Sequence, residues 1–353
     1  MAAGTSQVTI DGSHGEGGGA LLRVALTMSA MTLQPVEVTD IRGATLHPGI
    51  DPEDLTLMHA LAESTGAEMA GITPGANHVK FAPTRTPKGL SGRLASFRNE
   101  SNRGANALIV LNSLMPILAG AGVYCSVVCE GETFGTRALG YDAFAGMTLE
   151  VLKKLGLYAI PTLNKAAFGR EARGEVALDV EPSYLDGLDW TSRGEFLGMF
   201  ATVTTSNLPA SVGHRALSHL QSLANQYKTT IDVECVDVPA TGPGCNVTVS
   251  AMYERGMGGG SALGARGLRV EMLSQAAFRE AASWMESNSC LDAYLADQII
   301  VPCVFGHAPV RFSVSSITQR LLTSIWVIKQ FIPLRITVKG SEGKPGVIEI
   351  QRS

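Results

Sequence analysis

The sequence predicts an α+β fold in which α/β units repeat, with a small α+β domain inserted into the main body. Three observations support this prediction. Strand and helix patterns alternate over residues 1–85, the helix-then-strand unit returns with a period of about 90 residues, and the pattern changes after Pro182. The main domain is therefore predicted to comprise residues 1–182 and 283–353, and the inserted domain residues 183–282.

The first unit is predicted from its periodicity and its boundary residues. Apolar residues alternate in its strands and recur at helical spacing in its helices. Asp51 and Pro52 suit an N-cap and a first helical turn, and Gly66 suits a C-cap. The predicted elements are, in order, strand 7–12, helix 20–32, strand 36–43, helix 51–66 and strand 78–84.

The same alternation returns twice in the main domain. The elements predicted in the middle of the chain are helix 102–122, strand 124–132, helix 141–157 and strand 173–182. The elements predicted near its end are helix 291–306, strand 310–315, helix 317–332 and strand 334–340.

The inserted domain has a different pattern. Its predicted elements are strand 192–208, helix 213–227, strand 229–238 and strand 245–254. The stretch "RGMGGGSALGARG", residues 255–267, follows them and is predicted to be a glycine-rich connection back to the main domain.

Composition limits the class of protein. Of 353 residues, 45% are hydrophobic and 17% charged, which is typical of an ordered chain with a sizeable core. The net charge of −4 argues against a surface covered with phosphate contacts, although a local basic groove remains compatible with nucleic-acid binding. A basic segment followed by an apolar run is missing at the start, and no stretch of about 18 apolar residues occurs, so neither a signal peptide nor a membrane span is predicted.

The cysteines indicate a reducing compartment. They form no CxxC pair and have no histidine at ligand spacing, which argues against zinc. Cys125 and Cys129 lie in an apolar strand pattern and are predicted to be buried thiols. With no export signal, a cytoplasmic location is expected. The six are Cys125, Cys129, Cys235, Cys245, Cys290 and Cys303.

The stretch "DGSHGEGGGALLR", residues 11–23, is the first candidate site. Gly15, Gly17, Gly18 and Gly19 join a strand to a helix, where backbone N–H groups can bind an anion. The alternative is a tight turn that needs glycines for positive φ. The stretch does not match a Walker A loop, because no Lys-Ser or Lys-Thr follows the glycines, and it does not match the GxGxxG pattern, because Ala20 follows Gly19. The carboxylate of Glu16 among these glycines favours ligand binding by the loop over a plain turn. If the ligand is a phosphate, a divalent cation such as Mg²⁺ (or Mn²⁺) is required between the two negative groups.

Two further groups of charged residues lie in predicted loops. Arg42 and His47 follow a strand and suit contact with an anion, although solvated loop charge is the alternative. Arg98 and Arg103 precede an apolar helix. Cations at a helix start oppose its dipole, which favours a role in binding substrate.

The helix 291–306 carries a polar face. Tyr294 and Asp297 are three residues apart and therefore share that face, with Gln298 beside them. Among apolar neighbours, Asp297 is predicted to be partly buried and paired. The alternative is a purely structural pair or cap.

Together these stretches resemble one family. "DGSHGEGGGALLR", "IRGATLHPGI", "ATGPGCN", "YLADQIIVP" and "LLTSIWVIKQFIPLRI" resemble motifs of the RNA 3′-terminal phosphate cyclases, in the same order across nearly the whole chain. The resemblance implies three βαβαββ units with a small inserted domain. It also implies an activity: AMP passes from ATP to a histidine and then to an RNA 3′-phosphate, after which the 2′-hydroxyl displaces AMP and closes a 2′,3′-cyclic phosphate.

The resemblance implies roles for individual residues. Glu16 matches the carboxylate that contacts metal and phosphate, and Gly17 to Gly19 match the backbone that approaches the ligand. Arg42 matches a phosphate-contacting arginine. The segment with Tyr294, Asp297 and Gln298 matches the nucleotide-binding helix, so ATP with Mg²⁺ (or Mn²⁺) is the expected cofactor pair and an RNA 3′ end the expected partner, with no DNA and no membrane.

The chain departs from the family at the nucleophile. Arg320 stands where the family has its histidine, and a guanidinium stays protonated and forms no phosphoramidate at neutral pH. Asn112 stands where the family has a glutamine. His14 and His307 are alternative nucleophiles, and His47 is expected to contact phosphate; His14 and His47 are also candidate substrate contacts.

Three functions are compatible with these residues. The first is a cyclase-like, ATP-dependent enzyme that works with or without the usual covalent step. The second is a non-catalytic RNA- or nucleotide-binding scaffold on the cyclase fold. The third is an enzyme of small-molecule metabolism that activates a phosphate or carboxylate, because a fold does not fix a function.

Overall fold

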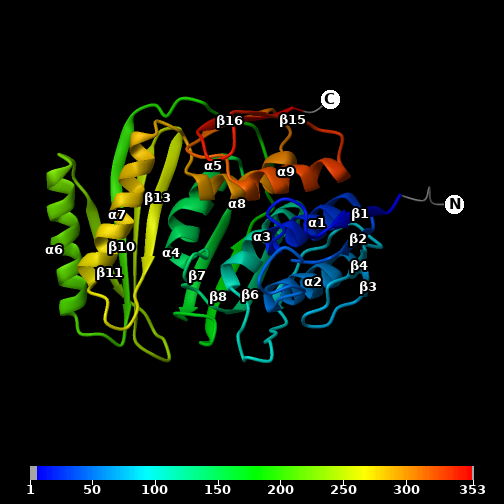
Figure 1. Ribbon diagram of the computed structural model, residues 1–353, viewed down its shortest axis with the longest axis horizontal. Coiled ribbons are helices and arrows are strands. Elements are labelled where there is room, and N and C mark those ends of the chain that lie inside the picture. Colours follow the sequence, from blue (N-terminus) through cyan, green and yellow to red (C-terminus); the bar gives the residue numbers. More distant parts are fainter. Residues whose placement is uncertain (1–5, 352–353) are drawn as a thin grey trace.

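The computed structural model describes residues 6–351 and is a mixed α/β structure. Its strands within that range form four four-stranded sheets. Helices pack between the sheets, and one lobe stands apart on the left in Figure 1. No helix formed by residues 6–351 has the length and apolar character needed to cross a bilayer.

The first sheet is built from residues 8–82 with the strand order β1-β2-β4-β3. β1 and β2 are parallel, and β4 is antiparallel to both β2 and β3. Its elements are β1 (Val8–Asp11), α1 (Gly19–Thr32), β2 (Val36–Thr39), α2 (Pro52–Thr65), β3 (Glu68–Ala70) and β4 (Val79–Ala82).

Two more sheets have the same pairing scheme. Their orders are β5-β6-β8-β7 and β9-β14-β16-β15. In each, the first two strands are parallel, and the last strand in the sequence is antiparallel to both of its neighbours. The elements of the second are β5 (Ser91–Arg93), α3 (Ala107–Gly120), β6 (Cys125–Gly131), α4 (Tyr141–Ala143), the π-helical turn η1 (Phe144–Thr148), α5 (Leu149–Lys154), β7 (Ala159–Lys165) and β8 (Gly174–Val180).

The third of these sheets is assembled from distant segments. Its elements are β9 (Leu188–Trp190), α8 (Ala293–Val304), β14 (Val310–Val314), α9 (Gln319–Phe331), β15 (Arg335–Lys339) and β16 (Gly346–Gln351). About a hundred residues separate β9 from α8 along the chain, yet β9 pairs in parallel with β14. The intervening segment therefore leaves the body and returns to it.

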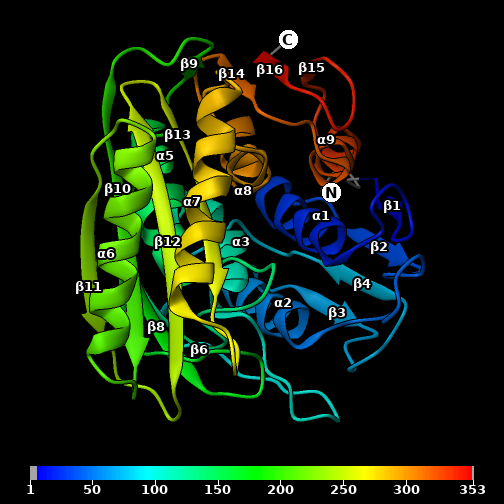
Figure 2. The same ribbon diagram turned by 60° about the vertical axis from the view of Figure 1, so that its left-hand side comes forward.

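That segment forms the separate lobe. Its sheet has the order β11-β10-β12-β13 and is covered by two long helices, which lie in front in Figure 2. Its buried side chains form a hydrophobic cluster distinct from the large central one. Its elements are β10 (Phe196–Ser206), α6 (Ser211–Gln226), β11 (Asp232–Asp237), β12 (Gly244–Tyr253), β13 (Gly256–Leu263) and α7 (Val270–Glu286).

The glycine-rich stretch is a strand, which corrects the prediction of a connection at 255–267. β13 pairs with β12 over its whole length. Its glycines are required by packing: a Cβ at Gly258 would enter the Trp284 ring, and one at Gly260 would meet Glu280. Helix α7 therefore lies so close to the sheet that only glycine fits.

Local signals explain several boundaries. Asp51 and Gly66 cap α2 as predicted, and the backbone N–H of Asp51 donates to Asp54 at 3.0 Å. Strand β6 alternates buried and half-buried residues, with Cys125 and Cys129 buried as expected. Helix α1 packs on α9, so the loop after β1 lies against the last helix of the chain.

Candidate functional site

A cavity of about 710 Å³ lies between the lobe and the main body. Pockets that bind drug-sized ligands span roughly 300–1,000 Å³, so this one accommodates a nucleotide. Its wall includes residues from α1, α3, α8, α9, the loop after β1 and the lobe strand β13. Six of the lining residues carry the argument below: Glu16, Arg23, Asn112, Asp292, Asp297 and Arg320.

The glycine loop is shaped by its contacts with the protein itself. Gly15 and Gly17 have φ of 61° and 57°, the left-handed region that favours glycine. A Cβ at Gly15 would collide with the hydroxyl of Thr323 in α9, and one at Gly19 with the guanidinium groups of Arg42 and Arg23. The backbone N–H of Glu16 donates to the Thr323 hydroxyl at 3.0 Å, which fixes the loop on α9.

Glu16 and Arg320 form a bidentate ion pair at the cavity wall. Arg320 Nε donates to Oε1 and Oε2 of Glu16 at 3.1 and 3.0 Å, and Nη2 donates to Oε1 at 2.7 Å. Hydrogen bonding to Glu16 raises the pKa of Arg320, and burial opposes this. The Arg320 side chain is 48% exposed, so it remains accessible from the cavity.

Asp297 lies beside this pair and is mostly buried. It accepts a hydrogen bond from the Thr318 hydroxyl at 2.7 Å. Burial raises the pKa of Asp297 to about 7, and the Thr318 hydrogen bond and the charge of Arg320 oppose the shift. Tyr294, one turn earlier in α8, is 58% exposed at the cavity. The structure thus brings Glu16, Asp297 and Tyr294 to one wall.

Asn112 and Gln298 join α3 to α8 across the cavity. The Asn112 amide donates to the backbone carbonyl of Gln298 at 3.2 Å. The side-chain oxygen of Gln298 accepts from the Thr148 hydroxyl. Asn112 Oδ1 is buried with no hydrogen-bond partner among the described residues, and a ligand donor in the cavity would satisfy it.

Two buried carboxylates link the lobe to the body. Asp292 accepts from the backbone of Tyr294 and Leu295, both at 2.8 Å, and from Gly259 of the lobe at 3.1 Å. Asp142 accepts from Thr204 at 2.9 Å and also from the lobe's β12. Burial raises the pKa of each carboxyl to about 6. These contacts set the position of the lobe wall relative to α8.

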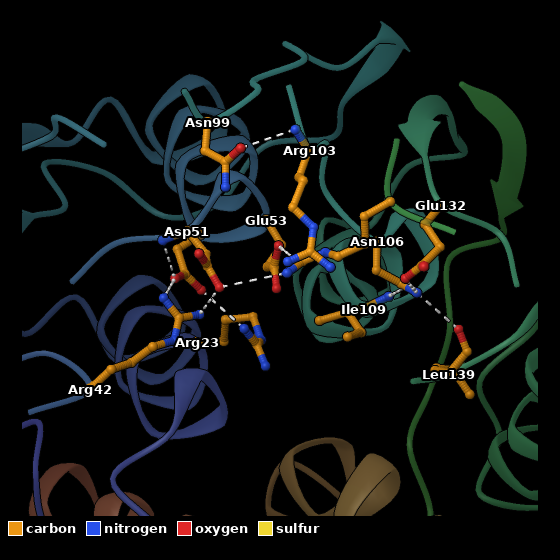
Figure 3. Close-up of polar contacts among 12 residues, drawn as sticks. Arg23, Arg42, Asp51, Glu53, Asn99, Arg103, Asn106, Ile109, Glu132 and Leu139 are labelled. Carbon is orange, nitrogen blue, oxygen red and sulfur yellow. Dashed lines mark hydrogen bonds and ion pairs between the residues drawn. The ribbon is translucent and has the colours of Figure 1, made fainter. Parts of the chain in front are cut away.

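A cluster of buried and partly buried charges, drawn in Figure 3, lies next to Gly19, the last residue of the glycine loop. Asp54 bridges two arginines, with its oxygens 3.0 Å from Arg23 Nη1 and 2.7 Å from Arg42 Nη1. Arg42 is also 3.4 Å from Asp51, and Arg170 pairs with Glu53. Arg23 lines the cavity, whereas Arg42 is 7% exposed at its side chain and committed to these carboxylates.

Glu132 extends the same polar region. It accepts from the Asn106 amide at 3.1 Å, and Asn106 also accepts from the backbone of Ile109 at 3.0 Å to cap α3. Burial raises the pKa of Glu132, whereas the Asn106 hydrogen bond lowers it and the charges of Arg170 and Arg103 lower it further. The Arg103 side chain points into this region in Figure 3.

The remaining candidates lie outside the lining formed by residues 6–351. His14 stacks on Trp326 with ring centroids 3.8 Å apart, and His307 stacks on Tyr184 at 4.3 Å. His47 is exposed. Arg98 donates to three backbone carbonyls of neighbouring loops, the shortest contact being 2.5 Å to Asn102. The structure does not bring these four side chains to the cavity wall, and the predicted site residues Gly15, Gly17, Gly18 and Arg103 are not part of the lining either.

The residues at Glu16 do not fit a divalent metal. Both carboxylate oxygens already accept from Arg320. Within residues 6–351, no group of three or more histidine, cysteine or acidic side chains could hold a metal ion. Mg²⁺ requires free oxygen ligands in octahedral geometry, and a guanidinium in contact with the Glu16 carboxylate opposes that arrangement.

Sequence analysis missed several lining residues, among them Arg23 and Asp292. Arg23 closes the "GALLR" motif, and its position one helical turn after Gly19 was the available signal. Asp292 precedes α8 as an N-cap residue, and its position before "AYL" was the corresponding signal. The contacts of Arg23 with Asp54 and of Asp292 with Gly259 join residues far apart in the sequence, so no local sequence pattern predicts them.

Taken together, the fold and cavity define a protein with a nucleotide-sized pocket, lined by charged side chains, between an α/β body and a smaller lobe. The chain belongs to a family described as RNA 3′-terminal phosphate cyclase, whose sequence pattern matches residues 14–338. The confirmed resemblance covers every residue that lines the cavity.

Curated relatives extend over nearly the full length. An RNA 3′-terminal phosphate cyclase of Thermococcus gammatolerans is 30% identical over 351 residues, covering 98% of each chain. One from Thermococcus kodakarensis is 30% identical with the same coverage, and one from Salmonella enteritidis is 30% identical over 95% of this chain and 96% of its own. Among solved structures, the enolpyruvyl transferase NikO of Streptomyces tendae matches 49% of this chain and 33% of its own. The identity is 16% and the TM-score 0.25, which is too low to indicate a shared fold.

Proposed function

We propose that this protein is an ATP-dependent enzyme that converts the 3′-phosphate of an RNA into a 2′,3′-cyclic phosphate. One observation carries the proposal: the family match at residues 14–338 spans the whole lining of the 710 Å³ cavity. The relatives are named for this activity, which favours it over a non-catalytic scaffold or an enzyme of small-molecule metabolism.

The proposed route has no covalent intermediate at residue 320. A guanidinium stays protonated, so Arg320 is suited to bind phosphate and not to attack it. An oxygen of the RNA 3′-phosphate attacks the α-phosphorus of ATP and releases diphosphate. The ribose 2′-hydroxyl then attacks the 3′-phosphorus, loses its proton and releases AMP. Adenylylation supplies the leaving group that a phosphate monoester lacks.

The chain's own residues support these steps by binding and orientation. Arg23, Arg137 and Arg320 line the cavity. Arg23 is held by Asp54, and the half-exposed Arg320 is the proposed phosphate-binding cation. The start of α1 offers backbone N–H groups to an anion. Asp297, with a pKa raised to about 7, is a lining carboxyl suited to exchange a proton near neutral pH. Mg²⁺ (or Mn²⁺) enters as part of the nucleotide substrate.

The experiment is an assay of cyclisation on a defined end. An RNA with a labelled 3′-phosphate is incubated with the protein, ATP and Mg²⁺, and protection of the label from phosphatase is measured. Protection that depends on ATP supports the proposal. Tight RNA binding without protection would instead favour the scaffold, and protection lost in a parallel Asp297→Ala sample would attribute the reaction to this cavity.

A second assay tests the absence of a covalent step. The protein is incubated with α-labelled ATP and Mg²⁺, denatured, and examined for bound label. No label together with active cyclisation supports direct transfer. Label on the protein would show that another residue, such as His14 or His307, acts as the nucleophile.

The proposal also covers architecture and location. The three sheets that share one pairing scheme are proposed to correspond to three βαβαββ units. The inserted domain, predicted at residues 183–282 between body segments 1–182 and 283–353, is proposed to begin after β9, which pairs with β14 in the body, and to end with α7 at Glu286. All six cysteines are free thiols, in keeping with a cytoplasmic location. An RNA 3′ end is the proposed partner.

A further inference from the structure

Glu16 and Arg320 are positioned before any ligand arrives. The backbone of Glu16 is anchored to Thr323 in α9, and Arg320 lies in the first turn of the same helix. Thr318 caps this helix by accepting from Leu321 at 3.0 Å. The pair therefore joins two rigid points 304 residues apart in the sequence.

The guanidinium occupies the place that a divalent cation would need. It contacts both Glu16 oxygens at 2.7–3.1 Å. A divalent cation at that carboxylate would have to displace these hydrogen bonds and lie beside a fixed positive charge. Arg320 already supplies the charge that neutralises Glu16.

We infer that Arg320 replaces the divalent cation at Glu16 and is itself the group that binds the nucleotide's phosphates. The contacts with Glu16 use Nε and Nη2, and a guanidinium carries five N–H groups, so those on Nη1 remain for a phosphate. The side chain is half exposed and lines the cavity. Planar guanidinium groups suit phosphate oxygens. The inference rests on the proposed function only in taking a nucleotide as the ligand.

This arrangement gives Glu16 a role opposite to that of a metal ligand. In a metal site, removing the carboxylate weakens binding of the metal–nucleotide complex. Here the negative charge of Glu16 repels a phosphate bound by the remaining N–H groups of Arg320, so removing that charge strengthens binding of an anion. The sign of the effect of Glu16→Gln therefore separates the two cases.

The test is calorimetric titration of ATP, once with EDTA and once with magnesium chloride. For Glu16→Gln in EDTA we expect binding up to about fivefold tighter than wild type, since an exposed ion pair is weak. For Arg320→Gln we expect binding weaker by about 10-fold or more, the loss typical of hydrogen bonds to a charged group. Arg320→Lys keeps the positive charge, and we expect its affinity for ATP to lie between those of wild type and Arg320→Gln. Arg215→Gln, a lobe arginine outside the cavity lining, is the matched control and binds like wild type.

Other results would overturn the inference in distinguishable ways. If wild type binds ATP only with magnesium and Glu16→Gln binds ATP more weakly, the inference is wrong and the proposed function is unaffected. Failure of wild type to bind ATP in either buffer sinks both. If Arg320→Gln does not fold, as judged by circular dichroism, the sign measured for Glu16→Gln decides alone.

Discussion

Two arginine–carboxylate groups contact the glycine loop, and they differ in burial. In the buried group, Asp54 is 0% exposed at its side chain and its partners Arg42 and Arg23 are 7% and 13% exposed. In the cavity pair, Arg320 is 48% and Glu16 28% exposed. The same chemistry thus serves the fold on one side, where every charge is bound by protein, and a ligand on the other, where a cation stays accessible.

The largest effect is expected at the buried group. Asp54→Asn removes the charge that neutralises Arg23 and Arg42 and places an amide against their N–H groups. We expect the free energy of unfolding to fall by about 3–5 kcal/mol, because two buried arginines lose their nearest carboxylate. Urea denaturation measures this. Glu271→Gln, at an exposed pair with Arg215, is the control and should leave the unfolding midpoint unchanged. A small loss for Asp54→Asn would mean that the two groups do not differ as burial suggests.

Gly15→Ala tests how the loop presents Glu16 to Arg320. The variant carries a Cβ at a left-handed φ and places it against the Thr323 hydroxyl. We expect a loss of stability of about 2–3 kcal/mol, combining backbone strain with the displaced contact. Gly75→Ala is a matched control, since its φ of 76° is similar and a Cβ there meets nothing within 4 Å. Equal losses for the two variants would show that the Thr323 contact is unimportant.

The sequence predicted individual elements and site residues better than the contacts between distant residues. Asp51 and Gly66 marked the ends of α2, and the spacing of Tyr294 and Asp297 predicted the shared helix face that lines the cavity. Strands β3, β5 and β9 were missed because three residues are too few to show alternation, and β13 because its glycines reflect packing against α7. The longer strands β7 and β16 and the helix α7 were not predicted either. The Glu16–Arg320 pair joins opposite ends of the chain, and no local pattern reports such a contact.

Asp297 provides a test in which the stability of the protein depends on pH. Its folded-state pKa of about 7 lies above its ordinary value of 3.8, so its contribution to stability is complete below about pH 4 and is lost as the pH rises through 7. Asp297→Asn keeps an acceptor for Thr318 and does not ionise. We expect it to exceed wild type at pH 8 by roughly 1–2 kcal/mol, with the difference declining toward acidic pH. Thermal unfolding from pH 5 to 8 measures this, and a difference independent of pH would contradict it.

The smallest effect on stability is expected where the effect on binding is largest. Arg320→Gln breaks the bidentate pair with Glu16, but both side chains reach solvent and water replaces the lost hydrogen bonds. We expect the free energy of unfolding to change by less than about 1 kcal/mol, measured by urea denaturation beside Asp54→Asn. A loss as large as that of Asp54→Asn would make the cavity pair a structural group like the buried one. A small loss combined with weakened nucleotide binding would mean that burial, and not charge or geometry, separates the arginines that hold the fold from the arginine that holds the ligand.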